Sequence, residues 1–276
     1  MGTSDDAKTR AARTYNAASD YYDDPANSFW ERFGRRTIER LDLSPGARVL
    51  DVCCGSGASA IPAAQSVGPD GFVLAVDLAE SLLDLARAKA EYRGLRHIEF
   101  RAGDMLDLNL PESDFDAVIC VFGIFFVPDM SAAARGLWRR VRPGGKLAVT
   151  TWGPRLFEPL NTAFWSSVRE VRPDLYKGFN PWDRVCDPGS LGSMLAGAGV
   201  DSPVVNLEAG TQPLRSPEDW WSMVLGSGYR GTIEQLDTER RELVRRDNLN
   251  FIREKGVTSV EANVIYAVAT KVQVAS

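Results

Sequence analysis

The sequence predicts an α/β fold built on a doubly wound, mostly parallel sheet of seven strands, with an antiparallel last strand and helical lid insertions. Two observations predict this fold. Short apolar runs alternate with helix-like stretches between residues 49 and 152, which is typical of strand–helix–strand units with parallel strands. The stretch 117–127 is almost continuously apolar, as expected for a central strand that is buried on both faces.

The elements follow in order along the chain. Two helices separated by a break at DDPAN are expected within residues 5–42, and a break of this kind, containing Pro, ends a helix. The core is then expected to contain strands and helices in alternation: strands at 49–53, 72–78, 97–104, 115–122 and 145–152, and helices from near Gly57, around Leu82–Ala86 and at 130–141. Two further strands are expected at 203–210 and 260–272. No crossover helix pattern immediately precedes the last one, which allows it to run antiparallel at the sheet edge.

Composition narrows the class of protein. The 276 residues are 44% hydrophobic and 25% charged, with a formal net charge of −5. This balance gives no electrostatic footprint for nucleic acid or for an anionic membrane. No apolar run approaches the roughly 20 residues that a membrane-spanning helix needs, and MGTSDDAKTR has no apolar core of a secretion signal. A cytoplasmic enzyme with a small-molecule substrate is expected, and both a monomer and a homo-oligomer are compatible with the sequence.

No metal site is expected. The four cysteines show no C-x-x-C spacing, and His97 is the one histidine of the chain. His97 is expected at the start of its strand, away from any ligand at the opposite end.

A glycine-rich loop follows the first core strand. Gly55, Gly57 and Ala60 satisfy the pattern G-x-G-x-x-G/A, and Asp77 follows about 20 residues later. Backbone N–H groups in such a loop can approach a ligand closely because no Cβ intervenes. The glycines alone leave the ligand open, and they would also fit a nicotinamide-dependent dehydrogenase.

Three acidic residues favour a different ligand. Asp51 lies inside the first strand, and Asp77 and Asp104 close the second and third strands. Three carboxylates at adjacent strand ends suit a ligand with a ribose and amino groups but without phosphates, because Asp51 would repel a pyrophosphate near the loop. The dehydrogenase alternative is therefore disfavoured.

At these motifs the sequence resembles the class I S-adenosylmethionine-dependent methyltransferases, in the branch of the ubiquinone and menaquinone biosynthesis C-methyltransferases (type 11). The resemblance covers residues 12–152 well and the remainder in outline. Five motifs carry it: VLDVCCGSG (49–57), AVDLAESLLDLAR (75–87), FRAGDM (100–105), FDAVICVFGIFFVPD (115–129) and RRVRPGGKLAVTTW (139–152). It implies a Rossmann-like fold, S-adenosyl-L-methionine as cofactor and S-adenosyl-L-homocysteine as product.

The resemblance also implies where the cofactor binds. The expected contacts are Asp51, Cys53, Gly55 and Gly57 at its amino-acid end, Asp77 at the ribose hydroxyls, Leu78, Gly103, Asp104 and Met105 around the adenine, and Phe122 and Gly123 beneath the methionine moiety.

Two cysteines stand at the start of the loop. The family pattern usually has glycine at position 53, and the cysteine there is expected only to require a backbone that avoids positive φ. Cys54 is a common loop residue of the branch, so both cysteines are interpreted as packing residues without a chemical role.

The candidates for catalysis lie outside the core motifs. Tyr22 and Asp23 match an aromatic and acidic pair that folds over the cofactor in this branch, so Tyr22 is expected both at the cofactor and in catalysis. Glu170 is the candidate base, because it follows Phe164 and Trp165 on an expected helix, and a carboxylate among aromatic rings can have a raised pKa.

The organisation around the core completes the prediction. Residues 1–42 form an N-terminal helical cover, 43–152 the cofactor-binding core, 153–187 a lid insertion, 188–214 a core helix and strand, 215–258 a second helical lid insertion and 259–276 the last core strand. Both insertions are expected to roof the site, because ligands of such sheets bind outside the carboxyl ends of the strands.

The roof is rich in aromatic residues. The expected substrate contacts are Tyr21, Trp152, Tyr176, Phe179, Trp182, Trp221 and Tyr229. Aromatic walls suit a hydrophobic acceptor that is aromatic, quinone-like or isoprenoid. Carbon is the favoured acceptor atom by resemblance; the alternatives are N- or O-methylation of a secondary metabolite, or a non-methylating reaction such as cyclisation. An isoprenoid diphosphate would need cations, for which Arg184, Arg215 and Arg230 are the roof candidates.

Overall fold

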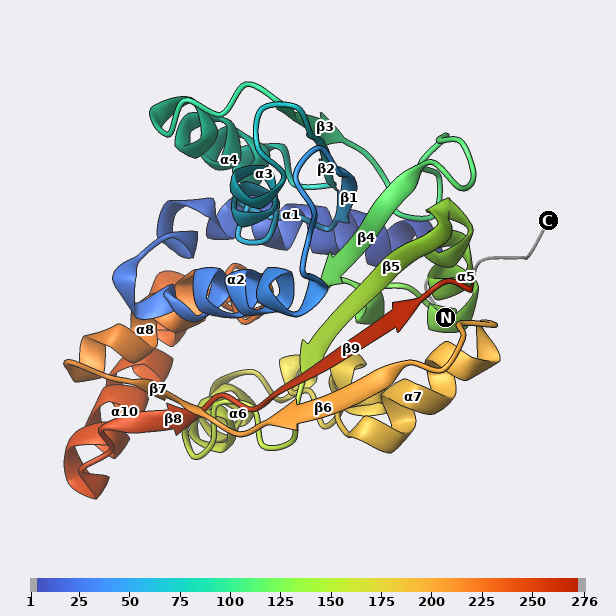
Figure 1. Ribbon diagram of the computed structural model, residues 1–276. Coiled ribbons are helices and arrows are strands. Elements are labelled where there is room, and N and C mark those ends of the chain that lie inside the picture. Colours follow the sequence, from blue (N-terminus) through green and yellow to red (C-terminus); the bar gives the residue numbers. More distant parts are fainter. Residues whose placement is uncertain (1–3, 273–276) are drawn as a thin grey trace.

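A seven-stranded sheet forms the centre of the protein, as the sequence predicts. The computed structural model describes residues 4–272, and its sheet has the strand order β3-β2-β1-β4-β5-β9-β6 (Figure 1). The strands are β1 (Arg48–Val52), β2 (Phe72–Asp77), β3 (Ile98–Ala102), β4 (Phe115–Val121), β5 (Val141–Trp152), β6 (Val204–Glu208) and β9 (Val264–Thr270). Every neighbouring pair from β3 to β5 is parallel.

The last strand lies inside the sheet and not at its edge. β9 pairs antiparallel with β5 on one side and with β6 on the other, and Figure 1 shows it between them. The expectation of an edge position is therefore wrong, although the antiparallel direction is confirmed. The first four residues of β9, from Val264 to Ala267, are all apolar and buried. A strand that is apolar on both faces is stabilised in the interior of a covered sheet and not at its edge.

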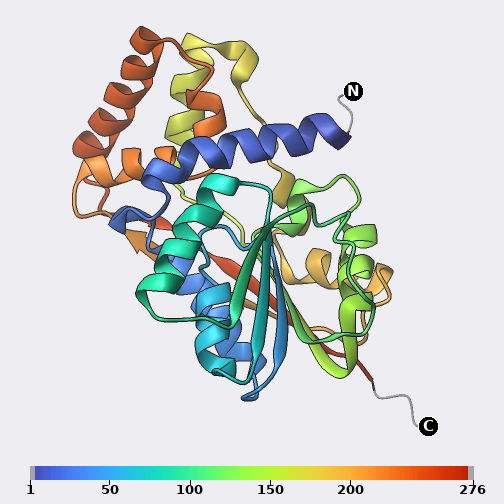
Figure 2. The same ribbon diagram turned by 90° about the horizontal axis from the view of Figure 1, so that it is seen from above.

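Helices cover both faces of the sheet (Figure 2). One face carries α2 (Phe29–Leu41), α3 (Ala60–Val67) and α4 (Glu80–Tyr92), and the other carries α5 (Met130–Arg140) and α7 (Pro188–Gly197). The aspartates at the start of α5 and α7, Asp129 and Asp187, cap these helices by accepting bonds from backbone N–H groups. Residues 103–114, between β3 and β4, contain turns and no helix.

The remaining elements gather beyond the carboxyl ends of the parallel strands. They are α1 (Ser4–Tyr22), α6 (Leu160–Val171), α8 (Pro217–Leu225), α9 (Arg230–Ile233), α10 (Thr238–Lys255) and a two-stranded sheet of β7 (Thr211–Pro213) with β8 (Ser259–Glu261). Short 3₁₀ turns connect them: η1 (Pro25–Asn27), η2 (Ile124–Phe126), η3 (Pro173–Leu175) and η4 (Pro181–Val185). Helix α1 runs between the core sheet and the lid helices, in contact with α4 and η2 on one side and α8 and α9 on the other (Figure 2).

An aromatic cluster joins the cover, the sheet and the lid. Phe122 and Trp152 stack with their ring centroids 3.9 Å apart, and Trp30, Phe29 and Phe157 surround them. Burying such large rings dominates core energetics and fixes the packing of neighbouring elements. The cluster therefore holds α2 and the start of the lid rigidly against the end of β5.

Candidate functional site

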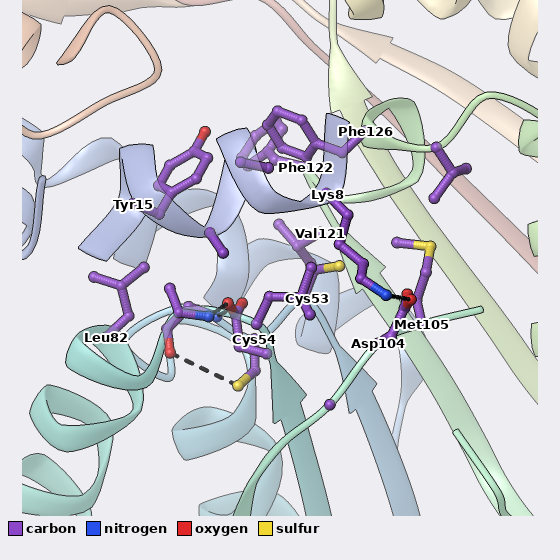
Figure 3. Close-up of a pocket in the computed structure, with 18 of the residues that line it drawn as sticks. Lys8, Tyr15, Cys53, Cys54, Leu82, Asp104, Met105, Val121, Phe122 and Phe126 are labelled. Atoms are coloured by element: carbon purple, nitrogen blue, oxygen red, sulfur yellow. Dashed lines mark hydrogen bonds and ion pairs between the residues drawn. The ribbon is translucent and has the colours of Figure 1, made fainter. Parts of the chain in front are cut away.

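A cavity opens at the carboxyl ends of β1, β2 and β4, and we call it the strand-end cavity (Figure 3). Its volume is about 1040 Å³, including space open to solvent. The register places the strand ends side by side, because Val52 pairs with both Val76 and Cys120. The loop after β1, the ends of the neighbouring strands and one face of α1 form its walls.

The glycine loop approaches the cavity through left-handed backbone conformations. Gly55 has φ +53° and Gly57 has φ +87°. A Cβ on Gly55 would lie 2.9 Å from the hydroxyl of Tyr22, so glycine is required for the loop and this tyrosine to meet. The turn is closed by a bond from the N–H of Gly57 to the carbonyl of Cys54.

Cys53 also has a left-handed backbone, with φ +61°. The expectation that this position avoids positive φ is therefore wrong. A non-glycine residue in this region carries a cost of roughly 1–2 kcal/mol, and the surroundings hold it there. Its side chain packs where residue 123 is glycine, because a Cβ on Gly123 would lie 2.5 Å from the Cβ of Cys53.

The thiols of the loop are not activated. The hydrogen bond with Cys120 and burial raise the pKa of Cys53 well above its ordinary value, and burial raises that of Cys54. A thiol with a raised pKa stays protonated at neutral pH and is a poor nucleophile. This supports a packing role for both cysteines.

Asp77 ties the loop to the end of β2. Its Oδ2 accepts a bond of 2.8 Å from the N–H of Gly55, and its Oδ1 accepts one of 2.8 Å from the N–H of Ala79. Burial raises the pKa of the carboxyl, and these N–H groups oppose that rise. Asp77 lines the cavity beside Leu78 and so presents an oriented carboxylate to a ligand.

Asp51 lies beneath the loop and is fully buried. Its Oδ2 accepts a bond of 2.6 Å from Ser59 Oγ, whereas its Oδ1 has no hydrogen-bond partner among the described residues. Burial raises the pKa of Asp51 to about 7. A buried carboxylate with an open oxygen is stabilised by a cation or a donor, and Ser59, its one side-chain partner, lines the cavity.

The third acid, Asp104, closes the far end of the cavity. Its Oδ2 pairs with Lys8 Nζ at 2.8 Å, and its Oδ1 accepts a bond from the N–H of Leu106 (Figure 3). Gly103 and Met105 line the same end. The structure therefore brings together the residues that the sequence assigns to an adenine, and it adds Lys8.

The opposite end of the cavity has an aromatic wall, made of Tyr15, Tyr22, Trp30, Phe122 and Phe126. Tyr22 stacks on Trp30 at 5.1 Å, and the ring of Tyr15 meets that of Phe126 edge to face at 5.6 Å. Burial raises the pKa of both tyrosines well above their ordinary value. Their hydroxyls therefore remain protonated donors at neutral pH.

Sequence reasoning missed several residues of this site, namely Lys8, Tyr15, Trp30 and Phe126. The spacing of Lys8, Ala11, Ala12, Tyr15 and Tyr22 puts them on one helical face, and all five line the cavity. That periodicity was the signal available in the sequence. The positions of Trp30 and Phe126 depend on tertiary packing and have no comparable signal.

Glu170 lies outside the cavity. It is exposed on α6, and the aromatic residues that precede it, Phe164 and Trp165, are buried on another side of the helix. The expectation of a carboxylate among aromatic rings is therefore wrong, because the helix directs Glu170 to solvent.

None of the seven expected substrate residues lines the strand-end cavity. Trp152 is 3% exposed within the aromatic cluster, and the buried Tyr229 donates to Asn161 Oδ1 at 2.7 Å. Tyr21 and Phe179 are exposed, and Trp221 is half-buried. Tyr176 and Trp182 line a second hollow in the lid. These residues were expected at the acceptor on the basis of aromatic composition. Composition does not report the direction in which each ring points, so it could not show which rings line the cavity.

The described part of the chain has neither a group of metal ligands nor a helix suited to crossing a membrane. No group of three or more His, Cys, Asp and Glu side chains is placed to hold a metal ion there, and His97 pairs its Nε2 with the carbonyl of Ala64 at the start of β3. None of the described helices combines the length and apolarity that crossing a membrane requires.

Comparison with known proteins agrees with this geometry. A family model described as a methyltransferase domain matches residues 49–145. A demethylmenaquinone methyltransferase of Anoxybacillus flavithermus is 33% identical over 174 residues, covering 62% of this chain and 73% of the relative. A nocamycin O-methyltransferase of Saccharothrix syringae is 37% identical over 129 residues, covering 47% of this chain and 46% of the relative, so the chain spans about half of that protein. The crystal structure of a SAM dependent methyltransferase from Aquifex aeolicus shares the fold, with a TM-score of 0.53 and 23% identity over 69% of this chain and 89% of that one.

Proposed function

Because the chain belongs to the class I S-adenosylmethionine-dependent methyltransferases, we propose that its strand-end cavity binds S-adenosylmethionine and that its acceptor is a small, largely hydrophobic molecule, methylated preferentially on carbon. The observation that carries the proposal is the aromatic wall at one end of a cavity whose other walls carry Asp77 and Asp104, with the buried Asp51 beneath the glycine loop. The strand-end cavity therefore offers polar groups for binding the cofactor and an apolar surface for binding the acceptor.

The chain's residues fit the cofactor. The open Oδ1 of Asp51 is a buried acceptor in need of a cation, and the ammonium of the cofactor's amino-acid end would supply one. Asp77 would accept from the ribose hydroxyls and Asp104 from the adenine amine, with Met105 and Leu78 beside the ring. When bound, the cofactor supplies a sulfonium methyl group that is already activated for transfer.

The aromatic wall supports an apolar acceptor. Tyr15, Trp30, Phe122 and Phe126 present ring surface to the cavity, and Val121 and Val127 continue this apolar surface. Flat or apolar molecules gain from burial against such surfaces. The names of two relatives, which refer to demethylmenaquinone and to nocamycin, are consistent with acceptors that are not simple polar amines.

The mechanism depends chiefly on alignment. No histidine lines the cavity, and its carboxylates, Asp77 and Asp104, lie along the expected cofactor site rather than in the aromatic wall. Holding a nucleophile in line with an activated methyl group can contribute about 7–11 kcal/mol, whereas a general base contributes about 10²–10⁴-fold. A phenol or enol that loses its proton to solvent becomes an anion with increased electron density on carbon, and the protonated hydroxyls of Tyr15 and Tyr22 can stabilise that anion by donating to its oxygen.

Methyl transfer itself tests the proposal. The enzyme would be incubated with ¹³C-methyl-labelled S-adenosylmethionine and a panel of hydroquinones, phenols, enolic ketones and polar amines, and the products examined by ¹³C NMR, which separates C-, O- and N-methyl groups. Transfer to carbon of an apolar acceptor is expected. Transfer to polar amines alone would contradict the proposed acceptor class, and cofactor binding without transfer to any acceptor would favour the cyclisation alternative.

A further inference from the structure

A second hollow lies within the lid, between α6 and the segment that contains η3 and η4, and we call it the lid pocket. Its volume is about 1010 Å³, including open space. It shares no lining residue with the strand-end cavity. In contrast to the aromatic wall of that cavity, the lid pocket is lined mainly by polar and charged side chains.

Two cations of this pocket have no carboxylate partner among the residues that the structure describes. Arg169 lies over the ring of Tyr176, with its guanidinium carbon 5.3 Å from the ring centroid, and Lys177 Nζ lies 5.6 Å from the ring centroid of Trp165. Among the described residues neither makes an ion pair. The rings hold both cations in place while leaving their charge uncompensated.

A third cation adds to the local positive charge. Burial of the ammonium lowers the pKa of Lys177, and the positive charge of Arg10 on α1 lowers it further. Arg10 also makes no ion pair with a described residue. Like charges that crowd together without counter-charges are unfavourable, and a bound anion would relieve this repulsion.

The acids of the pocket already have partners. Glu158 accepts bonds from Asn161 Nδ2 and from the hydroxyl of Thr162, at the start of α6. Asp183 accepts a bond of 2.7 Å from the N–H of Asn180 as part of a capping box. Both carboxylates keep their negative charge, but among the described residues neither forms an ion pair with Arg169 or Lys177.

The wall also contains an unsatisfied donor. Trp165 lines the pocket and is 6% exposed, and its buried Nε1 has no acceptor among the described residues. A buried polar group without a partner is destabilising by about 1–3 kcal/mol. The cations Arg169 and Lys177 share one chemical requirement, which is an acceptor with negative charge; the Nε1 of Trp165 is a buried donor in the same wall.

We propose that the lid pocket is a binding site for an anionic group, a phosphate or a carboxylate of a small molecule, held by Arg169 and Lys177. The site lies within the lid and shares no lining residue with the strand-end cavity. It does not depend on the methyl transfer proposed above.

Calorimetric titration of the full-length protein tests this site. The probes are inorganic phosphate, inorganic pyrophosphate and benzoate, at low ionic strength and neutral pH. Saturable binding of one probe is expected, and the probe that binds most tightly distinguishes a phosphate site from a carboxylate site. In the double variant Arg169→Gln/Lys177→Gln this binding is expected to weaken at least tenfold.

A matched variant controls for net charge. Arg93 and Arg96 follow α4, are exposed, do not line the lid pocket and make no ion pair with a described residue. The variant Arg93→Gln/Arg96→Gln therefore removes the same charge and is expected to retain binding. Unchanged melting temperature and unchanged affinity for S-adenosylhomocysteine in both double variants would show that the fold and the strand-end cavity are intact. Absence of saturable binding for all three probes, or an equal loss in both double variants, would overturn the proposal.

Discussion

Replacing Asp51 by asparagine should remove a pH dependence from cofactor binding. The Asp51 carboxyl is buried, has one open oxygen and has a pKa of about 7 instead of the ordinary 3.8. The shift corresponds to roughly 4 kcal/mol at about 1.36 kcal/mol per pKa unit. This is the penalty that the protein carries for ionising Asp51 when no cation is near.

The raised pKa of Asp51 determines whether cofactor affinity increases or decreases with pH. A carboxyl whose pKa is raised by folding favours the folded state fully below the unfolded pKa, and this contribution is lost as the pH rises through 7. A cationic ligand requires the ionised form, so binding must release a proton from the fraction that is still protonated. Cofactor affinity should therefore increase about tenfold between about pH 6 and about pH 8, with about half a proton released at pH 7.

Calorimetry with S-adenosylhomocysteine in two buffers of different ionisation enthalpy measures this proton release directly. Asp51→Asn keeps the size of the side chain and an acceptor for Ser59 while removing the titration. Titration of the ligand's own amine is common to both proteins and cancels in the comparison. If wild type and Asp51→Asn release the same number of protons and show the same pH profile, Asp51 does not face the cofactor's ammonium.

The other predictions concern single side chains. Asp77→Ala should weaken cofactor binding by about 1.5–3 kcal/mol, the range for hydrogen bonds to charged groups, and an unchanged dissociation constant in calorimetry would remove it from the ribose site. Tyr22→Phe should weaken cofactor binding by about 1 kcal/mol with an unchanged melting temperature; a fully retained affinity would contradict its contact with the cofactor. Glu170→Gln should leave turnover unchanged because the residue is exposed, and a large loss of kcat would restore it as a base. Cys53→Ala and Cys54→Ala should both keep methyl transfer in a labelled-cofactor assay, whereas inactive but folded variants would indicate thiol chemistry.

Much of the sheet could be predicted because its signal is local. Apolar runs such as VLDVC and FDAVICVF identify buried strands by composition alone, and the acids that close them follow directly. The position of β9 was not accessible in this way. Its place between β5 and β6 is set by pairings such as Leu147 with Ala269 and Val205 with Ala267, which join residues far apart in the sequence.

The residues of the site likewise differ in whether a local sequence signal places them. Asp77 and Asp104 could be placed because parallel strands in register bring their ends together. The backbone of Cys53 could not be predicted, because the space for its side chain is provided by Gly123, in the segment between β4 and η2. The direction of each lid ring, such as that of Trp152, depends on packing between distant segments, and composition carries no information about it.

Helix α1 has a consequence for the order of events in a catalytic cycle. It forms a wall of the strand-end cavity through Lys8 and Tyr15 and is attached to the core by the bond from the N–H of Ser81 to Asn16 Oδ1. We expect the cofactor to enter and the spent product to leave only when this helix lifts away. The kinetics should then be ordered, with the cofactor arriving first and its product departing last, and the rate of helix undocking would set an upper limit on turnover.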